Sequence, residues 1–416
     1  MSDYRSNLLA KAINTASGLL VSVVLARFLG VEARGEMGFI TQTGSIAGII
    51  LGLGLNQAFM FQLKSEAARG DLSGVYRRTV GLLLAQIAAL SALALVVSAV
   101  AARPVDRYLV WVSLAVTLYQ QLESIMAAYD IQLKIRVNMI YGIFRLVAHL
   151  LMWRLASPSL GWPVAIAITG YLLASAAYLS NGTNGRPHLP TVAYARTSYR
   201  FGWLPMLSTL LVVLNYNVDI VMLRGLGDSK TELGLYVVAA GIVTYLWVIP
   251  DAVKEVLVSR VVRSDRPDLV LRPLKAAVVA ALLSVLAVVI AGPFLIVLLF
   301  GAEYRGSYGL LLVLSVGVIP MVYYKMLGVT AIAEGSRGFY FLALLAASML
   351  NIGANLWSIP MFGAYGAAFT SVASYVLTGG LFVGWYCRRF GLSIANVLTI
   401  RRRDIQMLRA AAWSRH

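Results

Sequence analysis

Residues 338–387 read GFYFLALLAASMLNIGANLWSIPMFGAYGAAFTSVASYVLTGGLFVGWYC, and these 50 residues contain no Asp, Glu, Lys or Arg. A helix needs about 20 apolar residues to cross a hydrocarbon core of ~30 Å, so this stretch is long enough for two crossings. Pro360 and Gly363 supply a turn near its middle. The stretch therefore predicts two consecutive membrane-spanning helices, at 338–359 and 364–386.

The rest of the chain repeats this pattern. Of its 416 residues, 59% are hydrophobic and 13% charged, where soluble proteins carry about 25% charged residues. Apolar runs with few or no charges predict ten further helices: 8–29, 37–63, 79–102, 108–128, 138–153, 162–179, 201–223, 233–253, 276–300 and 308–330. We expect an all-α polytopic membrane protein with twelve transmembrane helices, and a soluble enzyme or a disordered chain is excluded. The one cysteine, Cys387, leaves no intramolecular disulfide and no Cys-rich metal site.

The positive charge is unevenly placed. With the N-terminus inside, the inner segments hold 25 of the 35 Lys and Arg residues, the outer loops hold 8, and Arg145 and Lys325 lie within helices. Lys and Arg concentrate on the cytoplasmic side of membrane proteins. We therefore expect a multi-pass protein of the bacterial cytoplasmic (inner) membrane with both termini cytoplasmic, and no nucleic-acid partner. The apolar stretch after Met1 is expected to be the retained first helix, because no clear cleavage site follows it.

Two halves of six helices are predicted on either side of a linker. The linker is the Gly/Pro/Asn-rich segment 181–200, between an N-terminal lobe at 1–180 and a C-terminal lobe at 201–387. Arg27-Phe28-Leu29-Gly30 and Arg224-Gly225-Leu226-Gly227 stand at equivalent places in the two halves. Such a parallel repeat is typical of transporters that hold substrate between two bundles and open alternately to each side.

Four stretches, in order along the chain, carry a family resemblance. They are Leu25–Gly30 with Gly35 and Gly38; Gly52-Leu53-Gly54 followed by Glu66–Asp71; Asn217-Val218-Asp219 with Gly234-Leu235-Tyr236; and Phe300–Tyr304 followed by Ile359–Ala368. The sequence resembles bacterial polysaccharide flippases of the multidrug/oligosaccharidyl-lipid/polysaccharide exporter superfamily. The resemblance implies two six-helix lobes forming a V around a central cavity. It also implies that a polyprenyl-diphosphate-linked oligosaccharide, the repeat unit of O-antigen, capsule or exopolysaccharide, is moved from the inner to the outer leaflet.

Three other functions remain open at this stage. A multidrug-extruder-like cation antiporter has the same architecture, and so does a lipid II flippase, although those proteins usually carry two further helices. A membrane enzyme acting on the same lipid, such as a polymerase or ligase, is disfavoured because the outer loops are short. No phosphate-binding loop, metal-ligand cluster or nucleophile elbow is present in the sequence. We therefore expect no enzyme activity, no cofactor and no bound metal.

Charged residues at membrane depth are costly and mark function by default. A diphosphate entering the membrane needs fixed cations in place of its water, and Arg145 and Lys325 are the candidates for this clamp. Two alternatives stay open: Arg145 pairs with Glu123 as a structural link, or Lys325 extends to the inner headgroups.

The remaining candidates are polar residues within spans. The candidates that would face sugar hydroxyls are Tyr323, Tyr324, Asn351 and Asn355. Hydrogen bonding between helices explains the two asparagines equally well. Candidates for proton or sodium coupling are Asp219, Glu123 and His149. Each of these three also has a structural interpretation, as a polar packing residue.

The C-terminal segment 388–416 is basic and amphipathic. Its apolar residues between Ser393 and Trp413 fall near one helical face, with Arg401, Arg402, Arg403 and Arg409 among the polar positions. This pattern predicts a cytoplasmic helix lying on anionic membrane lipid. Contact with a polysaccharide polymerase or with export proteins is a further expectation for such a transporter.

Overall fold

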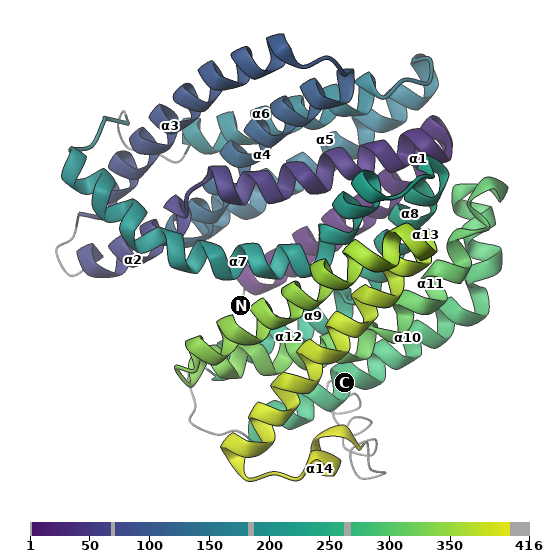
Figure 1. The fold of residues 1–416 in the computed structure, drawn as a ribbon. Helices are drawn as coiled ribbons and strands as arrows, with labels where there is room; N and C mark the ends of the chain where they lie inside the picture. Colours follow the sequence, from purple (N-terminus) through teal and green to yellow (C-terminus); the bar gives the residue numbers. More distant parts are fainter. Residues whose placement is uncertain (1, 68–70, 182–186, 262–267, 400–416) are drawn as a thin grey trace. The chain divides into compact units, whose positions relative to one another are not determined.

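The structure, a computed structural model, describes residues 2–67, 71–181, 187–261 and 268–399, and all the regular elements of this part are helices (Figure 1). In chain order they are α1 (Ser2–Leu51), α2 (Leu55–Ala67), α3 (Leu72–Val100), α4 (Pro104–Tyr129), α5 (Ile131–Leu155), α6 (Gly161–Asn181), α7 (Val192–Leu226), α8 (Lys230–Leu246), α9 (Val248–Val261), α10 (Asp268–Phe300), the 3-10 turn η1 (Ala302–Tyr304), α11 (Ser307–Val316), α12 (Val318–Ala333), α13 (Arg337–Phe390) and α14 (Ile394–Leu398).

The described helices reproduce the twelve predicted spans. Eight are long and apolar enough to cross a membrane, and the bent pair α11 and α12 makes nine. Dividing α1 and α13 at their glycine breaks adds two spans, and α4, which covers the predicted span 108–128 but is not among those nine, is the twelfth helix. Only 11% of the most apolar window of α10 is buried inside the protein, which is expected of a helix that faces lipid. The prediction of an all-helical polytopic membrane fold is confirmed.

Glycine at positive φ divides the two longest helices. Gly30 in α1 has φ 71°, and Gly363 in α13 has φ 56°. At Gly363 a Cβ would collide with the carboxylate of Glu232, which accepts a hydrogen bond of 2.7 Å from the backbone N–H of Ala364. The turn predicted at Pro360 and Gly363 therefore exists, and a side chain from α8 completes it.

Three predicted helices are broken inside the described chain. The predicted span 37–63 is interrupted at Gly52–Gly54, where Leu53 has φ 48°. The spans predicted at 233–253 and 308–330 are interrupted at Trp247 and Gly317, and Val-Ile-Pro follows both breaks, at 248–250 and 318–320. Proline is tolerated in the first turn of a helix, where its missing N–H has no intrahelical partner. Each proline thus begins a new helix instead of continuing the previous one.

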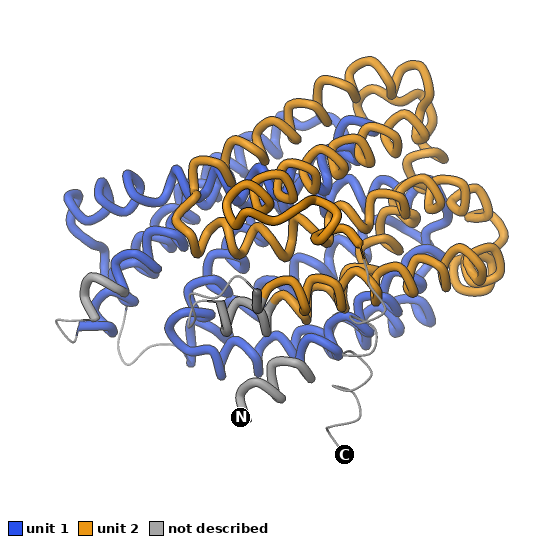
Figure 2. The backbone as a smooth tube through the Cα atoms, turned by 90° about the horizontal axis from the view of Figure 1, so that it is seen from below, with its two compact units in different colours: residues 1–224 blue, residues 225–416 orange. Residues whose placement is uncertain are grey.

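Two compact units make up the chain, residues 1–224 and 225–416, coloured separately in Figure 2. The predicted linker covers 181–200, but α6 ends at Asn181 and α7 already begins at Val192, so the connection between the two helices is shorter than predicted. The first half of α7 packs on α2 and α3 of unit 1. A Cβ on Gly54 would collide with the backbone of Gly202, and Gln62 donates a hydrogen bond of 2.8 Å to Ser198. Helix α7 is therefore grouped with unit 1, whereas the predicted C-terminal lobe begins at residue 201.

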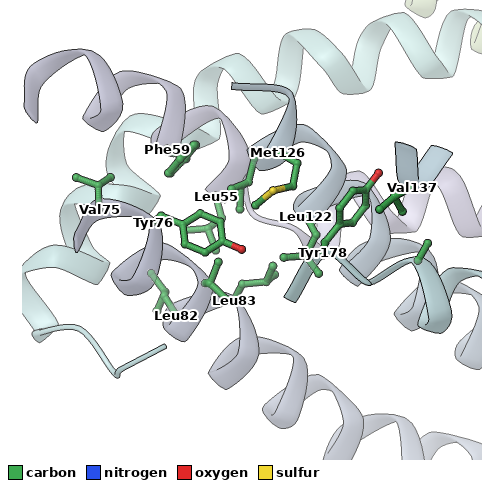
Figure 3. Packing of buried hydrophobic residues seen from close by; sticks show 13 residues of the cluster. Leu55, Phe59, Val75, Tyr76, Leu82, Leu83, Leu122, Met126, Val137 and Tyr178 are labelled. Atoms are coloured by element: carbon green, nitrogen blue, oxygen red, sulfur yellow. The ribbon is translucent and has the colours of Figure 1, made fainter. Parts of the chain in front are cut away.

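The interior of unit 1 is built around large apolar side chains from five helices. Figure 3 shows Leu55 and Phe59 of α2, Tyr76 of α3, Leu122 of α4 and Tyr178 of α6 packed together with their neighbours, and Val137 of α5 joins them. All of these residues are buried. Because lipid tails are as apolar as leucine, such contacts stabilise a membrane protein mainly through close packing.

Only part of the C-terminal segment 388–416 is described. Its described helix is α14, in which Val397 is buried. Most of the predicted surface helix between 393 and 413, including its four arginines, lies outside the described residues.

Candidate functional site

Arg145 lies at the contact between α5 and α1 in unit 1. Its guanidinium nitrogen Nη2 is 3.4 Å from the carbonyl oxygen of Asn14 and 3.4 Å from Oγ of Ser17, and the guanidinium carbon is 5.8 Å from the centre of the Tyr141 ring. The buried Nε of Arg145 has no hydrogen-bond partner among the described residues. All these contacts are with neutral groups. Within the described chain, the charge of Arg145 has no carboxylate partner.

Glu123 does not pair with Arg145, the partner considered for it from the sequence, but with other residues. Its Oε1 accepts a hydrogen bond of 2.8 Å from Nδ2 of Asn138 and lies 3.7 Å from Nζ of Lys134. Oδ1 of Asn138 in turn accepts from the hydroxyls of Tyr119 and Tyr178, at 3.1 and 2.8 Å. Glu123 therefore pairs with Lys134 and not with Arg145.

A small cavity of about 210 Å³ adjoins Glu123 within unit 1. Its lining contains four amide side chains and two hydroxyls: Asn56, Gln57, Gln120, Gln121, Ser124 and Thr209, together with Glu123, Ile49 and Met206. A Cβ on Gly48 would meet Oε1 of Gln120 at 2.9 Å, and one on Gly52 would collide with the amide of Gln121. Gly48 of α1 and Gly52, just after the end of α1, thus make room for the two glutamines of α4. Amides and hydroxyls both donate and accept hydrogen bonds, as recognition of sugar hydroxyls requires.

The other two candidates for ion coupling are buried in unit 1. A ring nitrogen of His149, Nδ1, lies 2.7 Å from the carbonyl oxygen of Arg145 one turn earlier. Oδ1 of Asp219 accepts a hydrogen bond of 2.8 Å from the backbone N–H of Ile220. Both side chains are thus engaged with the backbone of their own helix.

Lys325 forms an ion pair that joins α12 to α9 in unit 2. Its Nζ lies 2.8 and 3.0 Å from the two carboxylate oxygens of Asp251, and 4.7 Å from the centre of the Trp247 ring. The side chain of Lys325 is 9% exposed and that of Asp251 31% exposed. The cation is therefore almost fully removed from solvent, while its partner carboxylate remains accessible.

The pair sits beside the two breaks that carry Val-Ile-Pro. Asp251 directly follows Pro250, and Lys325 lies five residues after Pro320. The ring of Tyr375, on α13, packs edge-on against Trp247 with centroids 6.0 Å apart, and its Cδ2 would lie 2.6 Å from a Cβ on Gly317. One aromatic ring therefore contacts both breaks.

Three of the four residues expected to face sugar, Tyr324, Asn351 and Asn355, have hydrogen-bond partners inside unit 2. Tyr323 and Tyr324 are buried, and the hydroxyls of Tyr324 and Tyr340 lie 3.0 Å apart. Nδ2 of Asn355 donates to Oδ1 of Asn351 at 2.9 Å, and Oδ1 of Asn355 accepts from the hydroxyl of Thr370. The bond to Thr370, and one of 3.4 Å from Nδ2 of Asn351 to Oγ of Ser371, link the two spans of α13. They favour the alternative in which the two asparagines hold helices together.

Several polar partners at these sites were not identified from the sequence. They are Asp251, Trp247, Lys134, Asn138 and the amide residues of the small cavity. Of these, only Asp251 and Trp247 stand beside a feature visible in the sequence, the repeated Val-Ile-Pro.

Among the described residues, no group of three or more His, Cys, Asp or Glu side chains is placed to hold a metal ion.

Comparison with known proteins places this chain in a family. A family model described as "Polysaccharide biosynthesis protein" matches residues 3–250, more than half of the sequence. The chain belongs to the polysaccharide biosynthesis protein family. A search of curated proteins finds no match to this chain.

Solved structures of membrane transporters are similar to this chain. A lipid II flippase in an inward closed conformation matches with a TM-score of 0.78 at 14% identity, over 98% of this chain and 92% of that one. A multidrug resistance transporter of the MATE family, in an inward-facing conformation, matches with a TM-score of 0.68 at 13% identity, over 95% of this chain and 100% of that one. At these identities the likeness concerns the fold, and it confirms the predicted exporter fold.

Proposed function

We propose that this chain is a flippase that moves a polyprenyl-diphosphate-linked oligosaccharide repeat unit from the inner to the outer leaflet of the bacterial cytoplasmic membrane. The unit would serve the synthesis of a cell-surface polysaccharide such as O-antigen, capsule or exopolysaccharide, and the two lobes would give alternating access. Membership of the polysaccharide biosynthesis family supports this function, as does a fold similar to that of a lipid II flippase.

The observation that carries the proposal is the ion pair of Lys325 and Asp251. A diphosphate at membrane depth must exchange its water for fixed donors, and charge-assisted hydrogen bonds to a cation are the strongest available. Lys325 is already desolvated, and its partner Asp251 is the more exposed of the two. In our proposal the diphosphate displaces Asp251 from Lys325, so that the lysine remains paired before and after substrate binds.

Arg145 is the second cation that we assign to the anionic substrate. Its described partners are a carbonyl, a hydroxyl and an aromatic ring, and none of these neutralises its charge. An uncompensated cation attracts a diphosphate and repels a cationic drug. The sign of this charge therefore supports lipid-linked oligosaccharide over the multidrug-extruder alternative.

The amide-lined cavity of unit 1 is our candidate for contact with the oligosaccharide. Its four amides and two hydroxyls supply both donors and acceptors, whereas Asn351 and Asn355 already bond to neighbours in α13. Glu123 lines the same cavity and is 28% exposed. It is thus the carboxylate that we propose for proton or sodium coupling.

The proposal is tested with purified protein in vesicles. A polyprenyl diphosphate carrying a short fluorescent oligosaccharide is placed in both leaflets, and a membrane-impermeant quencher added outside reports how much lipid becomes accessible. We expect complete quenching with the protein and about half without it. Parallel vesicles contain fluorescent lipid II or a cationic dye. Protein-dependent efflux of the dye without movement of the oligosaccharide lipid would establish the antiporter function instead, and movement of lipid II alone would establish the lipid II function.

A further inference from the structure

A groove on α13 in unit 2 lies apart from the residues of the proposed substrate site. It has a volume of about 700 Å³, within the usual range of ligand pockets, about 300–1,000 Å³. The α13 groove is lined by Phe339, Val376, Leu377, Gly380, Leu381, Gly384, Trp385, Arg388 and Arg389. All but Phe339 lie on the second span of α13, so the groove runs along that helix.

The floor of the groove is helix backbone. A Cβ built on Gly380 or on Gly384 would have no heavy atom within 4 Å, so the missing side chains leave open space. One wall is aromatic, because the rings of Phe339 and Trp385 stack with centroids 5.6 Å apart at an interplanar angle of 15°. An apolar channel with a rigid aromatic wall fits a hydrocarbon chain lying along the helix.

One end of the groove is positively charged. Arg389 is neutralised by Glu334, whose Oε2 lies 2.9 Å from Nη2 of the arginine. Arg388 is exposed and has no ion pair or hydrogen bond among the described residues. Among the described residues that line it, the groove therefore ends in a net charge of +1, which belongs to Arg388.

We infer that the α13 groove binds one anionic glycerophospholipid, with an acyl chain along Gly380 and Gly384 and its phosphate on Arg388. A phosphodiester such as that of phosphatidylglycerol carries one negative charge, which matches the one uncompensated arginine. A zwitterionic headgroup brings its own cation and gains less from this end of the groove. The inference does not depend on the proposed transport of oligosaccharide lipid.

Trp385 provides the measurement. Bromine atoms on an acyl chain quench tryptophan fluorescence at contact, so purified protein is placed in vesicles containing brominated phosphatidylglycerol or brominated phosphatidylcholine at equal mole fractions. The difference between wild type and Trp385→Phe isolates the signal of this tryptophan from those of the other seven. Near a membrane surface one Lys or Arg favours anionic lipid by about 1 kcal/mol, so we expect a preference of roughly fivefold for phosphatidylglycerol.

Two variants and two controls assign the preference to the groove. Arg388→Gln should abolish it, while Arg337→Gln, an exposed arginine of α13 outside the groove, should not. Gly380→Leu should reduce quenching by both lipids, whereas Gly353→Leu, where a Cβ also meets nothing within 4 Å, should leave it unchanged.

Three results would overturn the inference. They are equal quenching by the two lipids in wild type, an unchanged preference in Arg388→Gln, and displacement of the brominated lipid by polyprenyl phosphate at lower concentration than by unlabelled phosphatidylglycerol. The last result would assign the groove to the chain of a polyprenyl lipid.

Discussion

The ammonium group of Lys325 lies 2.8 Å from a carboxylate oxygen of Asp251, and each residue stands shortly after the proline that follows a helix break. The pair therefore ties together two spans that are not straight rods. Movement of either α9 or α12 relative to the other changes the distance between the charges. A ligand that competes for Lys325 would act directly on this link.

Replacing Lys325 tests the diphosphate clamp. Lys325→Ala removes a charge-assisted contact that is worth roughly 1.5–3 kcal/mol, so the rate of oligosaccharide-lipid transport should fall about ten- to a hundredfold. Asp251→Asn keeps the cation and removes its competitor, so this variant should bind inorganic diphosphate more tightly than wild type. Transport is measured in vesicles, and binding by calorimetry on the purified protein.

A purely structural ion pair would give a different pattern. Removing one partner of a buried pair leaves an uncompensated charge and destabilises the protein, and removing both relieves this cost. If Lys325→Met with Asp251→Asn restored both the melting temperature and transport to wild-type values, Lys325 would have no role in binding the substrate.

Arg145 and Glu123 are expected to act independently. Arg145→Ala should lower transport by roughly tenfold or more at a normal protein level, because it removes a charge-assisted contact with the diphosphate and leaves the pair of Glu123 and Lys134 intact. Arg145→Lys should keep part of the activity, since a point charge still attracts phosphate without the planar fork. Adding Glu123→Gln to Arg145→Ala should restore nothing. Recovery of transport in that double variant would show that the two residues are coupled after all.

Three glycine variants separate backbone strain from collision. Gly353→Ala, in an ordinary helical position with open space, should leave the melting temperature in detergent unchanged or slightly raised. Gly30→Ala has the same open space but φ 71° and ψ 176°, a backbone region essentially restricted to glycine, which costs a residue with a Cβ roughly 1–3 kcal/mol. Gly363→Ala adds a collision with Glu232 to a positive φ, so it should melt lowest of the three. Equal melting of the last two variants would mean that the contact with Glu232 contributes nothing.

The predicted orientation is tested by cysteine labelling in a Cys387→Ser background. Leu189 is exposed in the connection before α7, and the Lys and Arg distribution predicts that this connection lies in the cytoplasm. A membrane-impermeant maleimide should therefore label Leu189→Cys only after the cells are opened. Ser157→Cys, in the loop between α5 and α6, should be labelled in intact cells. The reverse pattern would invert the topology.

The spans could be predicted from sequence because hydropathy and turn residues are local signals. The turn at Gly363 illustrates this, since Pro360 and Gly363 mark it within an otherwise uninterrupted apolar run. The break after Gly52 was missed because it depends on Leu53 adopting φ 48°, which the residue type disfavours and the surrounding structure imposes. Likewise, Lys325 could be recognised as a costly charge, but its partner could not. Asp251 lies 74 residues away in sequence, and only the packing of α9 on α12 brings the two together.

The contact of Glu232 with the turn at Gly363 has a consequence for biogenesis. The two groups are separated by 132 residues, and the carboxylate belongs to the first helix of unit 2 while the turn lies within its last long helix. During synthesis the acceptor is thus in place long before the N–H that it receives emerges from the ribosome. Unit 2 acquires this closing hydrogen bond only when its final hairpin enters the membrane, so a chain truncated before residue 364 would leave Glu232 without that donor. A Glu232 carboxylate without the backbone donor of Ala364 thus distinguishes a truncated unit 2 from a completed one.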